Sequence, residues 1–378
     1  MKLEPAFTQR IEGKSADKLS LCYQCGTCTA VCPAGVPVRS LIRGSQLGLR
    51  ESVIGDQRLW YCATCKLCEV ECPRGVKITD TIHALRVIAY EGKKVPRKLE
   101  GALWSVYEDA NPWGGKKVDR SKWAEGLNIN TDRPAKFLLY VGCAASFDPR
   151  LQHVARSVAS ILSKAGVDFS VLGGENCCGD VVYQMGEEAF FEELVQGNIR
   201  SFAKSGAEAI IVVSPHCFNM FRSVYPKYGG VPTAFHYTEF LAGLLDKGSL
   251  CLGRLDGDAA VTYHDPCYLG RYHGIYEEPR KLLEGIQGVK LSEMGDCKAN
   301  ALCCGGGGGG MWVDQEGERP SLHRVKQAAD TGASQMVTSC PYCIQNFEDS
   351  AKTAGVSMEV TDVSEVIARA LRLDGGQG

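Results

Sequence analysis

The chain has 378 residues, of which 44% are hydrophobic and 23% are charged, and its 42 Lys and Arg nearly balance its 44 Asp and Glu. This length suggests roughly two or three domains. The small net charge gives no strong field to attract nucleic acid or anionic lipid. Because the longest apolar runs, FLLYVG and AIIVV, are too short to cross a bilayer, we expect membrane contact only through another subunit.

Cysteine is unusually frequent, with 19 residues, and the N-terminal stretch MKLEPAFTQRIEGKSAD has no apolar signal-peptide core. Disulfides belong mainly to oxidising compartments. The sequence therefore predicts a reduced, cytoplasmic metal-binding protein, free or held at the inner face of the membrane by a partner.

Eight of the cysteines form two runs with the same spacing, Cys22-x2-Cys25-x2-Cys28-x3-Cys32-Pro33 and Cys62-x2-Cys65-x2-Cys68-x3-Cys72-Pro73. This spacing is typical of two-cluster ferredoxins, in which the fourth thiolate of each run binds the cluster of the other. It predicts one cubane [4Fe-4S] cluster on Cys22, Cys25, Cys28 and Cys72, and a second on Cys62, Cys65, Cys68 and Cys32. Structural zinc is the alternative, but zinc sites usually pair two C-x2-C knuckles.

The segments around these runs have helical patterns. SLIRGSQLGLRESVIGDQRLW indicates a helix, a turn and a helix, and TDTIHALRVIAYEG indicates another helix. We expect an α-helical ferredoxin domain over residues 1–105 and a linker over 106–134, which is rich in Gly, Pro, Asn and charge. Trp113 and Trp123 of this linker either pack on the neighbouring domain or anchor the chain on another surface.

The rest of the chain repeats one unit, predicted over residues 135–252 and 253–378. In each copy an apolar run ends in a cysteine, a helical stretch and a second apolar run follow, and then come a Cys-Cys-Gly triplet and a short final motif. The matching residues are Cys143 and Cys267, Cys177-Cys178-Gly179 and Cys303-Cys304-Gly305, and Ser214-Pro215-His216-Cys217 and Cys340-Pro341-Tyr342-Cys343. Strands alternating with helices predict parallel sheets with the cysteines at strand ends. The fold class expected is an α+β multidomain protein.

The second Cys-Cys pair is followed directly by glycine. Gly305 gives the backbone freedom that two adjacent cysteines need to face one centre, and the run from Gly305 to Gly310 lets main-chain amides approach sulfur. Such amides raise the reduction potential of an iron-sulfur cluster. A flexible loop is the alternative, and phosphate binding is a weak match because Met311-Trp312 follows in place of Lys-Ser/Thr.

The paired pattern resembles the cysteine-rich CCG domains of heterodisulfide reductases, through HDPCYLGR at 264–271 and CCGGGGGGMW at 303–312. The N-terminal part is similar to their iron-sulfur subunit, so the chain looks like that subunit fused to the catalytic one. These motifs are specific for the superfamily and not for a substrate. Similar proteins include subunits of anaerobic glycerol-3-phosphate and lactate dehydrogenases and subunits that serve benzoyl-CoA reduction.

This resemblance implies a noncubane [4Fe-4S] cluster at the second CCG domain, held by Cys267, Cys303, Cys304, Cys340 and Cys343. A disulfide takes up two electrons while cubanes deliver one at a time, so a centre that captures a cleaved sulfur bridges the mismatch. His264 and His273 flank Cys267 and are candidate proton donors, with His264 included in the predicted catalytic set. The alternative is that both only form local hydrogen bonds.

The first copy departs from the pattern because Ser214 stands where the fifth cysteine is expected. Cys143, Cys177, Cys178 and Cys217 remain, and four thiolates suit tetrahedral zinc, a cubane or a modified cluster. Zinc or another structural centre is slightly favoured, which argues against a two-cluster disulfide-splitting site. Cys251 and Cys297 lie outside both motifs and are interpreted as ordinary thiols.

The expected function is that of an iron-sulfur oxidoreductase subunit of the heterodisulfide reductase type, which reduces or forms a disulfide. The alternative is a non-catalytic electron relay in a larger anaerobic complex, of the quinone-linked dehydrogenase or benzoyl-CoA reductase type. A zinc-stabilised scaffold is a third, non-redox interpretation. Because no convincing flavin or nicotinamide fingerprint is present, the electrons imply a redox partner, first a flavoprotein and second a b-type cytochrome or quinone-reactive subunit.

Overall fold

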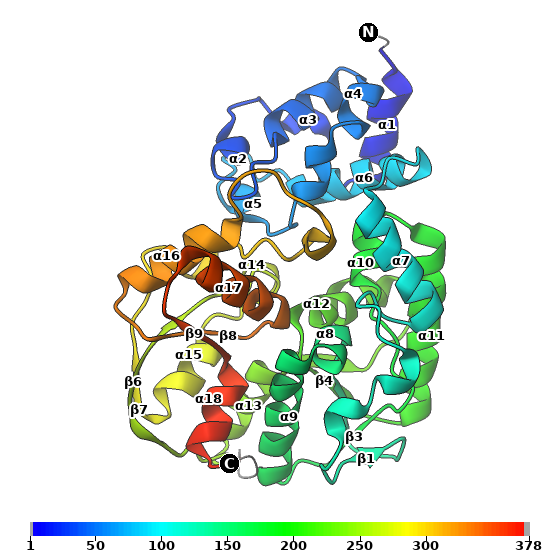
Figure 1. The fold of residues 1–378 in the computed structure, drawn as a ribbon. Coiled ribbons are helices and arrows are strands. Elements are labelled where there is room, and N and C mark those ends of the chain that lie inside the picture. Colours follow the sequence, from blue (N-terminus) through cyan, green and yellow to red (C-terminus); the bar gives the residue numbers. More distant parts are fainter. Residues whose placement is uncertain (1–2, 374–378) are drawn as a thin grey trace.

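The computed structural model describes residues 3–373 and begins with a helical domain, drawn in blue and cyan in Figure 1. Its helices α2 and α5 each follow a residue with positive φ, Gly26 and Lys66, so the two cysteine runs adopt the same local shape. This confirms the predicted helical ferredoxin-type domain. The helices are α1 (Pro5–Lys14), α2 (Thr27–Ala30), α3 (Val38–Gln46), α4 (Arg50–Ile54), α5 (Leu67–Val70), α6 (Ile78–Glu91) and α7 (Arg97–Asp109).

The next part of the chain forms a five-stranded parallel sheet with strand order β1-β3-β2-β4-β5. Its strands are β1 (Asn130–Thr131), β2 (Phe137–Tyr140), β3 (Phe169–Val171), β4 (Ala209–Val212) and β5 (Thr233–His236). The helices of this half are α8 (Cys143–Phe147), α9 (Pro149–Lys164), α10 (Asp180–Met185), α11 (Glu188–Ser205), α12 (Pro215–Asn219) and α13 (Tyr237–Asp246).

The last part forms a four-stranded parallel sheet with strand order β7-β6-β8-β9. Its strands are β6 (Arg254–Tyr263), β7 (Gln287–Leu291), β8 (Gln335–Thr338) and β9 (Glu359–Asp362). The helices are α14 (Gly270–His273), α15 (Glu277–Glu284), α16 (Pro320–Asp330), α17 (Pro341–Ala354) and α18 (Val363–Ala370). The order β7-β6-β8-β9 repeats β3-β2-β4-β5, which confirms the predicted duplication.

The structure contains elements that the repeat motifs did not predict. Each half ends with a further strand and helix, β5 with α13 and β9 with α18, beyond the last cysteine motif. Helix α7 runs on past residue 105 to Asp109, and β1 lies within the segment predicted as a linker. The precise limits 1–105, 106–134, 135–252 and 253–378 stay predictions. No helix within residues 3–373 is both long and apolar enough to cross a membrane.

The two tryptophans of the 106–134 segment pack inside this same chain. Trp123 is buried in the core of the first half. The Trp113 ring lies 5.2 Å from the Trp312 ring and 5.7 Å from the Tyr342 ring, measured between centroids. Trp113 therefore attaches the segment to the second sheet domain through aromatic contacts, and the buried Trp123 attaches it to the first.

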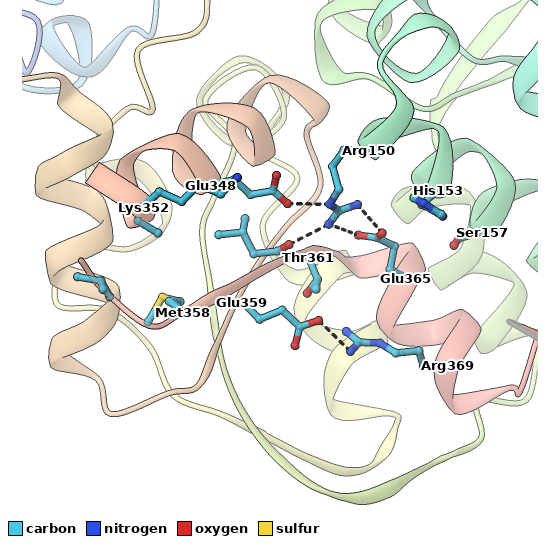
Figure 2. Close-up of a pocket in the computed structure, with 13 residues that line it drawn as sticks. Arg150, His153, Ser157, Glu348, Lys352, Met358, Glu359, Thr361, Glu365 and Arg369 are labelled. Atoms are coloured by element: carbon cyan, nitrogen blue, oxygen red, sulfur yellow. Dashed lines mark hydrogen bonds and ion pairs between the residues drawn. The ribbon is translucent and has the colours of Figure 1, made fainter. Parts of the chain in front are cut away.

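A partly buried arginine network joins the two sheet domains. Figure 2 shows Arg150 of α9 reaching Glu348 of α17 and Glu365 of α18, at 2.7 and 2.6 Å. Arg150 also donates to the main-chain oxygen of Val360, at 2.9 Å. Charge-assisted bonds of this kind are short and directional. A cavity of about 610 Å³ lies beside the network, but no cysteine lines it, so it is separate from the cysteine sites.

Candidate functional site

The eight ferredoxin cysteines surround two separate cavities. One is lined by Cys22, Cys25, Cys28 and Cys72, and the other by Cys32, Cys62, Cys65 and Cys68. Each set takes three thiols from one run and the fourth from the other, as the spacing predicts. No three His, Cys, Asp or Glu side chains within residues 3–373 are arranged around a single metal ion. The thiols instead enclose spaces, and four thiolates around a space are the donor set of a cubane cluster.

The second of these cavities adjoins the second CCG site. Cys303 lines it, and the thiols of Cys65 and Cys303 are within hydrogen-bond reach of each other. Three side chains of the CCG domain also hold the ferredoxin run: Arg271 Nε donates to Cys65 O at 2.5 Å, Tyr272 Oη donates to Thr64 O at 2.8 Å, and Tyr268 Oη lies 2.6 Å from Thr64 Oγ1. The two sites therefore touch through cysteine side chains and share a rigid boundary.

Arg86 of α6 stands at the junction of all three domains and is fully buried. In the described part of the chain its hydrogen bonds go to main-chain oxygens: Gln184 and Gly308 at 3.3 and 2.8 Å, and Leu59, Trp60 and Cys62 at 3.2, 3.3 and 2.7 Å. A buried charge is costly unless an opposite charge compensates it. Burial raises the pKa of the Cys62 thiol to about 12, and Arg86 opposes that rise. The second ferredoxin cavity, which Cys62 lines, is therefore suited to an anionic metal centre.

The second CCG site gathers the five predicted cysteines in the protein interior. Cys267 follows β6, Cys340 caps α17, Cys343 lies in its first turn, and Cys303 and Cys304 precede the glycine loop. The Cys343 and Cys304 sulfurs are 3.3 Å apart. The amides of Gly305 and Gly306 donate to the sulfurs of Cys303 and Cys304 at 3.3 and 3.4 Å. All five cysteines are buried.

The glycine loop is pressed against the second ferredoxin run. A methyl group at Gly307 would overlap the main-chain oxygen of Ala63, and one at Gly308 would overlap that of Cys62. Gly305 has φ +85°, which supplies the bend after the cysteine pair. The loop is thus a close backbone contact rather than a free surface loop.

Neither predicted histidine has a hydrogen bond to a thiol in the described residues. His264 Nδ1 accepts from Arg324 Nε at 3.1 Å, and burial together with Arg324 holds the pKa of His264 well below its usual value. His273 Nε2 contacts Asn219 Oδ1 at 3.1 Å, and burial lowers the pKa of His273 to about 4. Both are therefore neutral near pH 7, and a catalytic role for His264 stays a prediction.

His216 is a site residue that was not predicted from the sequence. It lies within hydrogen-bond reach of Cys340, and its Nδ1 is 2.9 Å from Asp180 Oδ2. Burial lowers its pKa, but Asp180 and Cys340 outweigh burial and raise the pKa to about 10. His216 and Tyr342 occupy equivalent places in the two final motifs and stack at 4.3 Å. The sequence could have indicated His216 through this equivalence, because the repeat places both His216 and Tyr342 beside a cysteine.

The first CCG site gathers its four cysteines as well. Hydrogen-bond contacts link Cys143 to Cys177, Cys177 to Cys178, and Cys178 to Cys217. Ser214 is 4% exposed, and within the described residues its hydroxyl has no hydrogen-bond partner. The serine that replaces the fifth cysteine therefore faces the protein interior beside four thiols.

A buried cation lies beside this first site. Arg120 Nη2 donates to the Cys143 sulfur at 3.3 Å, and Arg120 Nη1 pairs with Glu175 at 2.9 Å. Glu175 in turn accepts from the amides of Val141 and Gly142, at 2.9 and 3.0 Å. Four thiolates carry more negative charge than most metal ions neutralise, so this arginine suits a thiolate-bound metal centre.

Two family models match the chain. A 4Fe-4S dicluster domain covers residues 21–78, and the cysteine-rich CCG domain covers residues 137–222 and 261–348. The chain therefore belongs to the family of iron-sulfur proteins that join a dicluster ferredoxin domain to two CCG domains, a family that includes a heterodisulfide reductase subunit. It is an iron-sulfur protein of the electron-transfer oxidoreductase type.

Three relatives illustrate the range of this family. The chain is 33% identical over 335 residues to the "Probable iron-sulfur-binding oxidoreductase FadF" of Bacillus subtilis, covering 84% of this chain and 47% of the relative. It is 34% identical over 296 residues to the EtfAB:quinone oxidoreductase of Syntrophomonas wolfei, covering 73% and 41%. It is 32% identical over 272 residues to a subunit of the dihydromethanophenazine:CoB–CoM heterodisulfide reductase of Methanosarcina mazei, covering 70% and 66%. The chain spans less than half the length of the first two.

One solved structure shares the fold. A hypothetical protein from Helicobacter pylori matches all of this chain and 74% of its own length, with a TM-score of 0.57 and 10% identity. At that identity the match speaks for the arrangement of elements only.

Proposed function

We propose that the chain passes electrons from a redox partner through two cubane [4Fe-4S] clusters to a noncubane [4Fe-4S] cluster in the second CCG domain, where a disulfide is reduced or formed. The observation that carries this proposal is the contact between Cys65 and Cys303, because it joins a ferredoxin cavity to the CCG site without an intervening layer. The likeness to a subunit of heterodisulfide reductase supports the choice of a disulfide.

Three sets of cysteines would hold the three clusters in order along the electron path. Cys22, Cys25, Cys28 and Cys72 would hold the first cubane, where Cys25 is exposed and lets a partner approach. Cys32, Cys62, Cys65 and Cys68 would hold the second, beside Arg86. Cys267, Cys303, Cys304, Cys340 and Cys343 would hold the last cluster, with the amides of Gly305 and Gly306 donating to sulfur. When bound, these clusters supply one-electron carriers.

The overall reaction balances with the partner as reductant. One S–S bond breaks, two electrons arrive through the ferredoxin-type domain, two protons come from solvent, and two thiols leave. His216 lies within hydrogen-bond reach of Cys340 and so positions that ligand. A flavoprotein is the first candidate partner, and a b-type cytochrome or quinone-reactive subunit is the second. A relative named for quinone oxidoreduction supports a redox partner of one of these kinds.

We propose zinc or another structural centre for the first CCG site, held by Cys143, Cys177, Cys178 and Cys217, whose sulfurs would have to move to surround one ion because no three such side chains do so within residues 3–373. Four thiolates suit tetrahedral zinc, and Ser214 in place of a fifth cysteine disfavours a second noncubane cluster. A pure relay is the second candidate function. It is favoured by that same departure, since only one CCG site keeps all five cysteines, and by the relatives named for other oxidoreductions.

A disulfide assay on the cluster-loaded protein tests the proposal. With titanium(III) citrate as electron donor, we expect Cys304→Ser to lower disulfide reduction to below about a hundredth of the wild-type rate while both cubanes remain reducible. Cys251→Ser, at an exposed thiol outside all the cysteine sites, is the matched control. Equal turnover by Cys304→Ser would refute disulfide chemistry at this site. Absence of turnover in the wild type, with copurification of a dehydrogenase, would favour the relay.

A further inference from the structure

The space between the two CCG sites is filled by aromatic side chains. The His216 ring lies between the rings of Tyr268 and Tyr342, at 4.3 Å from each. All three residues are buried, and the Tyr268 hydroxyl contacts Thr64 at 2.6 Å and accepts from Gln184 at 3.1 Å. A ligand bridging the two sites would have to displace these hydrogen-bonded rings. A substrate must therefore reach the second site from another side.

A cavity of about 400 Å³ opens on the second site from the outside. Cys304 is the cysteine that lines it, together with residues of the glycine loop and of helices α16 and α17, which lie side by side in Figure 1. This volume falls within the usual range for small-molecule sites. Gly305 and Gly310 line the same cavity, so main chain without side chains forms the part of its wall next to Cys304.

The cavity has apolar side chains in its wall, and its rim is charged but balanced. Met311 and Trp312 line it, and both are polarizable side chains that suit contact with an organic sulfur compound. At the rim Lys98 pairs with Asp314 at 2.7 Å, and Arg319 pairs with Asp349. Because each cation has its own carboxylate, the rim does not select strongly for net charge. The apolar wall and the balanced charge of the rim therefore favour a small organic ligand over a strongly charged protein surface.

We propose that this cavity, between the glycine loop and α16 and α17, is the entrance for a low-molecular-weight disulfide that reacts at the centre held by Cys304. The inference rests on the proposed function and names its substrate class. The disulfide enters, its S–S bond is cleaved by two electrons delivered through the ferredoxin-type domain, each sulfur gains a proton from solvent, and both thiols leave by the same opening.

Val313→Trp is designed to fill this cavity in the full, cluster-loaded protein. Val313 lines the cavity and is half-buried, so a larger side chain at this position is expected to occupy space in the cavity. Val118→Trp is the matched control, because Val118 is 87% exposed and lies outside the cavity. Oxidised glutathione is the substrate probe with titanium(III) citrate as donor. Reduced glutathione is titrated into the oxidised protein while EPR records the paramagnetic signal expected from thiol bound at the oxidised cluster of the second CCG site.

We expect Val313→Trp to lose about tenfold or more in glutathione turnover and to require correspondingly more thiol to change the signal. Iron content and reduction of the cubanes should match the Val118→Trp control. An unchanged thiol titration in Val313→Trp would overturn the proposed entrance while leaving disulfide chemistry intact. Turnover of oxidised thioredoxin but not of glutathione would overturn the substrate class. A wild-type protein that responds to no thiol would refute the proposed function itself, and with it this inference.

Discussion

At the scale of single residues, Arg86 places a buried positive charge beside the second ferredoxin run. It is a buried cation whose hydrogen bonds, in the described chain, all go to main-chain oxygens from three domains. An anionic cluster next to Cys62 would provide the missing negative charge. The same arginine holds the glycine loop against the ferredoxin run, so it couples charge compensation to domain contact.

Replacing Arg86 should change the potential of one cluster selectively. Removing a nearby positive charge disfavours the reduced, more negative state of a cluster. We expect Arg86→Gln to make the potential of the cluster at Cys32, Cys62, Cys65 and Cys68 more negative by on the order of 60 mV, about 1.4 kcal/mol for one electron. Potentiometric EPR titration measures this, with Arg86→Lys as the charge-preserving control. An equal shift of both cubanes would contradict the assignment.

Ser214 allows a test of the metal in the first CCG site. Within the described residues its buried hydroxyl has no hydrogen-bond partner, and it stands in the place of a cysteine. If zinc occupies the four remaining thiolates, Ser214→Cys should add no new iron-sulfur signal and should keep about one zinc per chain. Metal analysis together with EPR checks this. A gain of iron with an altered spectrum would show that the site accepts a cluster.

At the scale of elements, the glycine loop sets the distance between the second ferredoxin cavity and the CCG site. A side chain at Gly307 would meet Ala63 O, so we expect Gly307→Ala to slow electron arrival at the CCG site by about tenfold while both cubanes remain intact. Rapid-mixing spectroscopy follows this step. Gly295→Ala is the control because no heavy atom lies within 4 Å of its added methyl group. Wild-type rates in Gly307→Ala would refute the role of the loop.

Helices α6 and α10 pack together at His83, an imidazole whose pKa lies well below its usual value. His83 Nε2 lies 3.0 Å from Tyr183 O, the two rings stack at 4.2 Å, and burial lowers the pKa of His83 to about 4. The unfolded chain, with a pKa of about 6.5, therefore binds this proton first as the pH falls. The contribution of His83 is fully present above about pH 6.5 and is lost as the pH falls toward about 4.

This predicts a specific loss of stability in mild acid. Between about pH 7 and pH 5 the free energy of unfolding should fall by about 2 kcal/mol through His83 alone. His83→Gln should lose that part of the pH dependence while keeping a polar side chain at the contact. Thermal unfolding of both proteins across this pH range, at equal iron content, measures the difference. Parallel pH profiles would contradict the assignment.

The elements also show what the sequence could predict. The helical ferredoxin domain and the duplicated parallel sheets followed from cysteine spacing and from apolar runs, because both are local patterns. β5 and β9 were missed because no cysteine motif marks them. His216, Arg86 and Arg120 were missed for a different reason: each acts through a contact with residues distant in sequence, such as His216 with Cys340 and Arg120 with Cys143, which spacing does not encode.

At the scale of the whole molecule, the three domains form one path for electrons in the proposed function. The exposed Cys25 marks its outer end, the Cys65–Cys303 contact its middle, and the cavity at Cys304 its far end. The first CCG domain adds His216 and Asp180 to the structure around this path, but its own site, beside Arg120 of the 106–134 segment, lacks the fifth cysteine. The two copies of the repeat therefore carry unequal sites, one with five cysteines and one with four.

The iron, sulfide and zinc content of anaerobically purified protein, with EPR of its oxidised form in the presence and absence of thiols, tests most directly whether the second CCG site holds a cluster. Two cubanes and one further four-iron cluster predict about twelve irons per chain, and zinc at the first CCG site adds one zinc per chain. They also predict a thiol-dependent paramagnetic signal that disappears in Cys304→Ser. About eight irons with no response to any thiol would contradict a cluster at the second CCG site and leave only a ferredoxin-type relay.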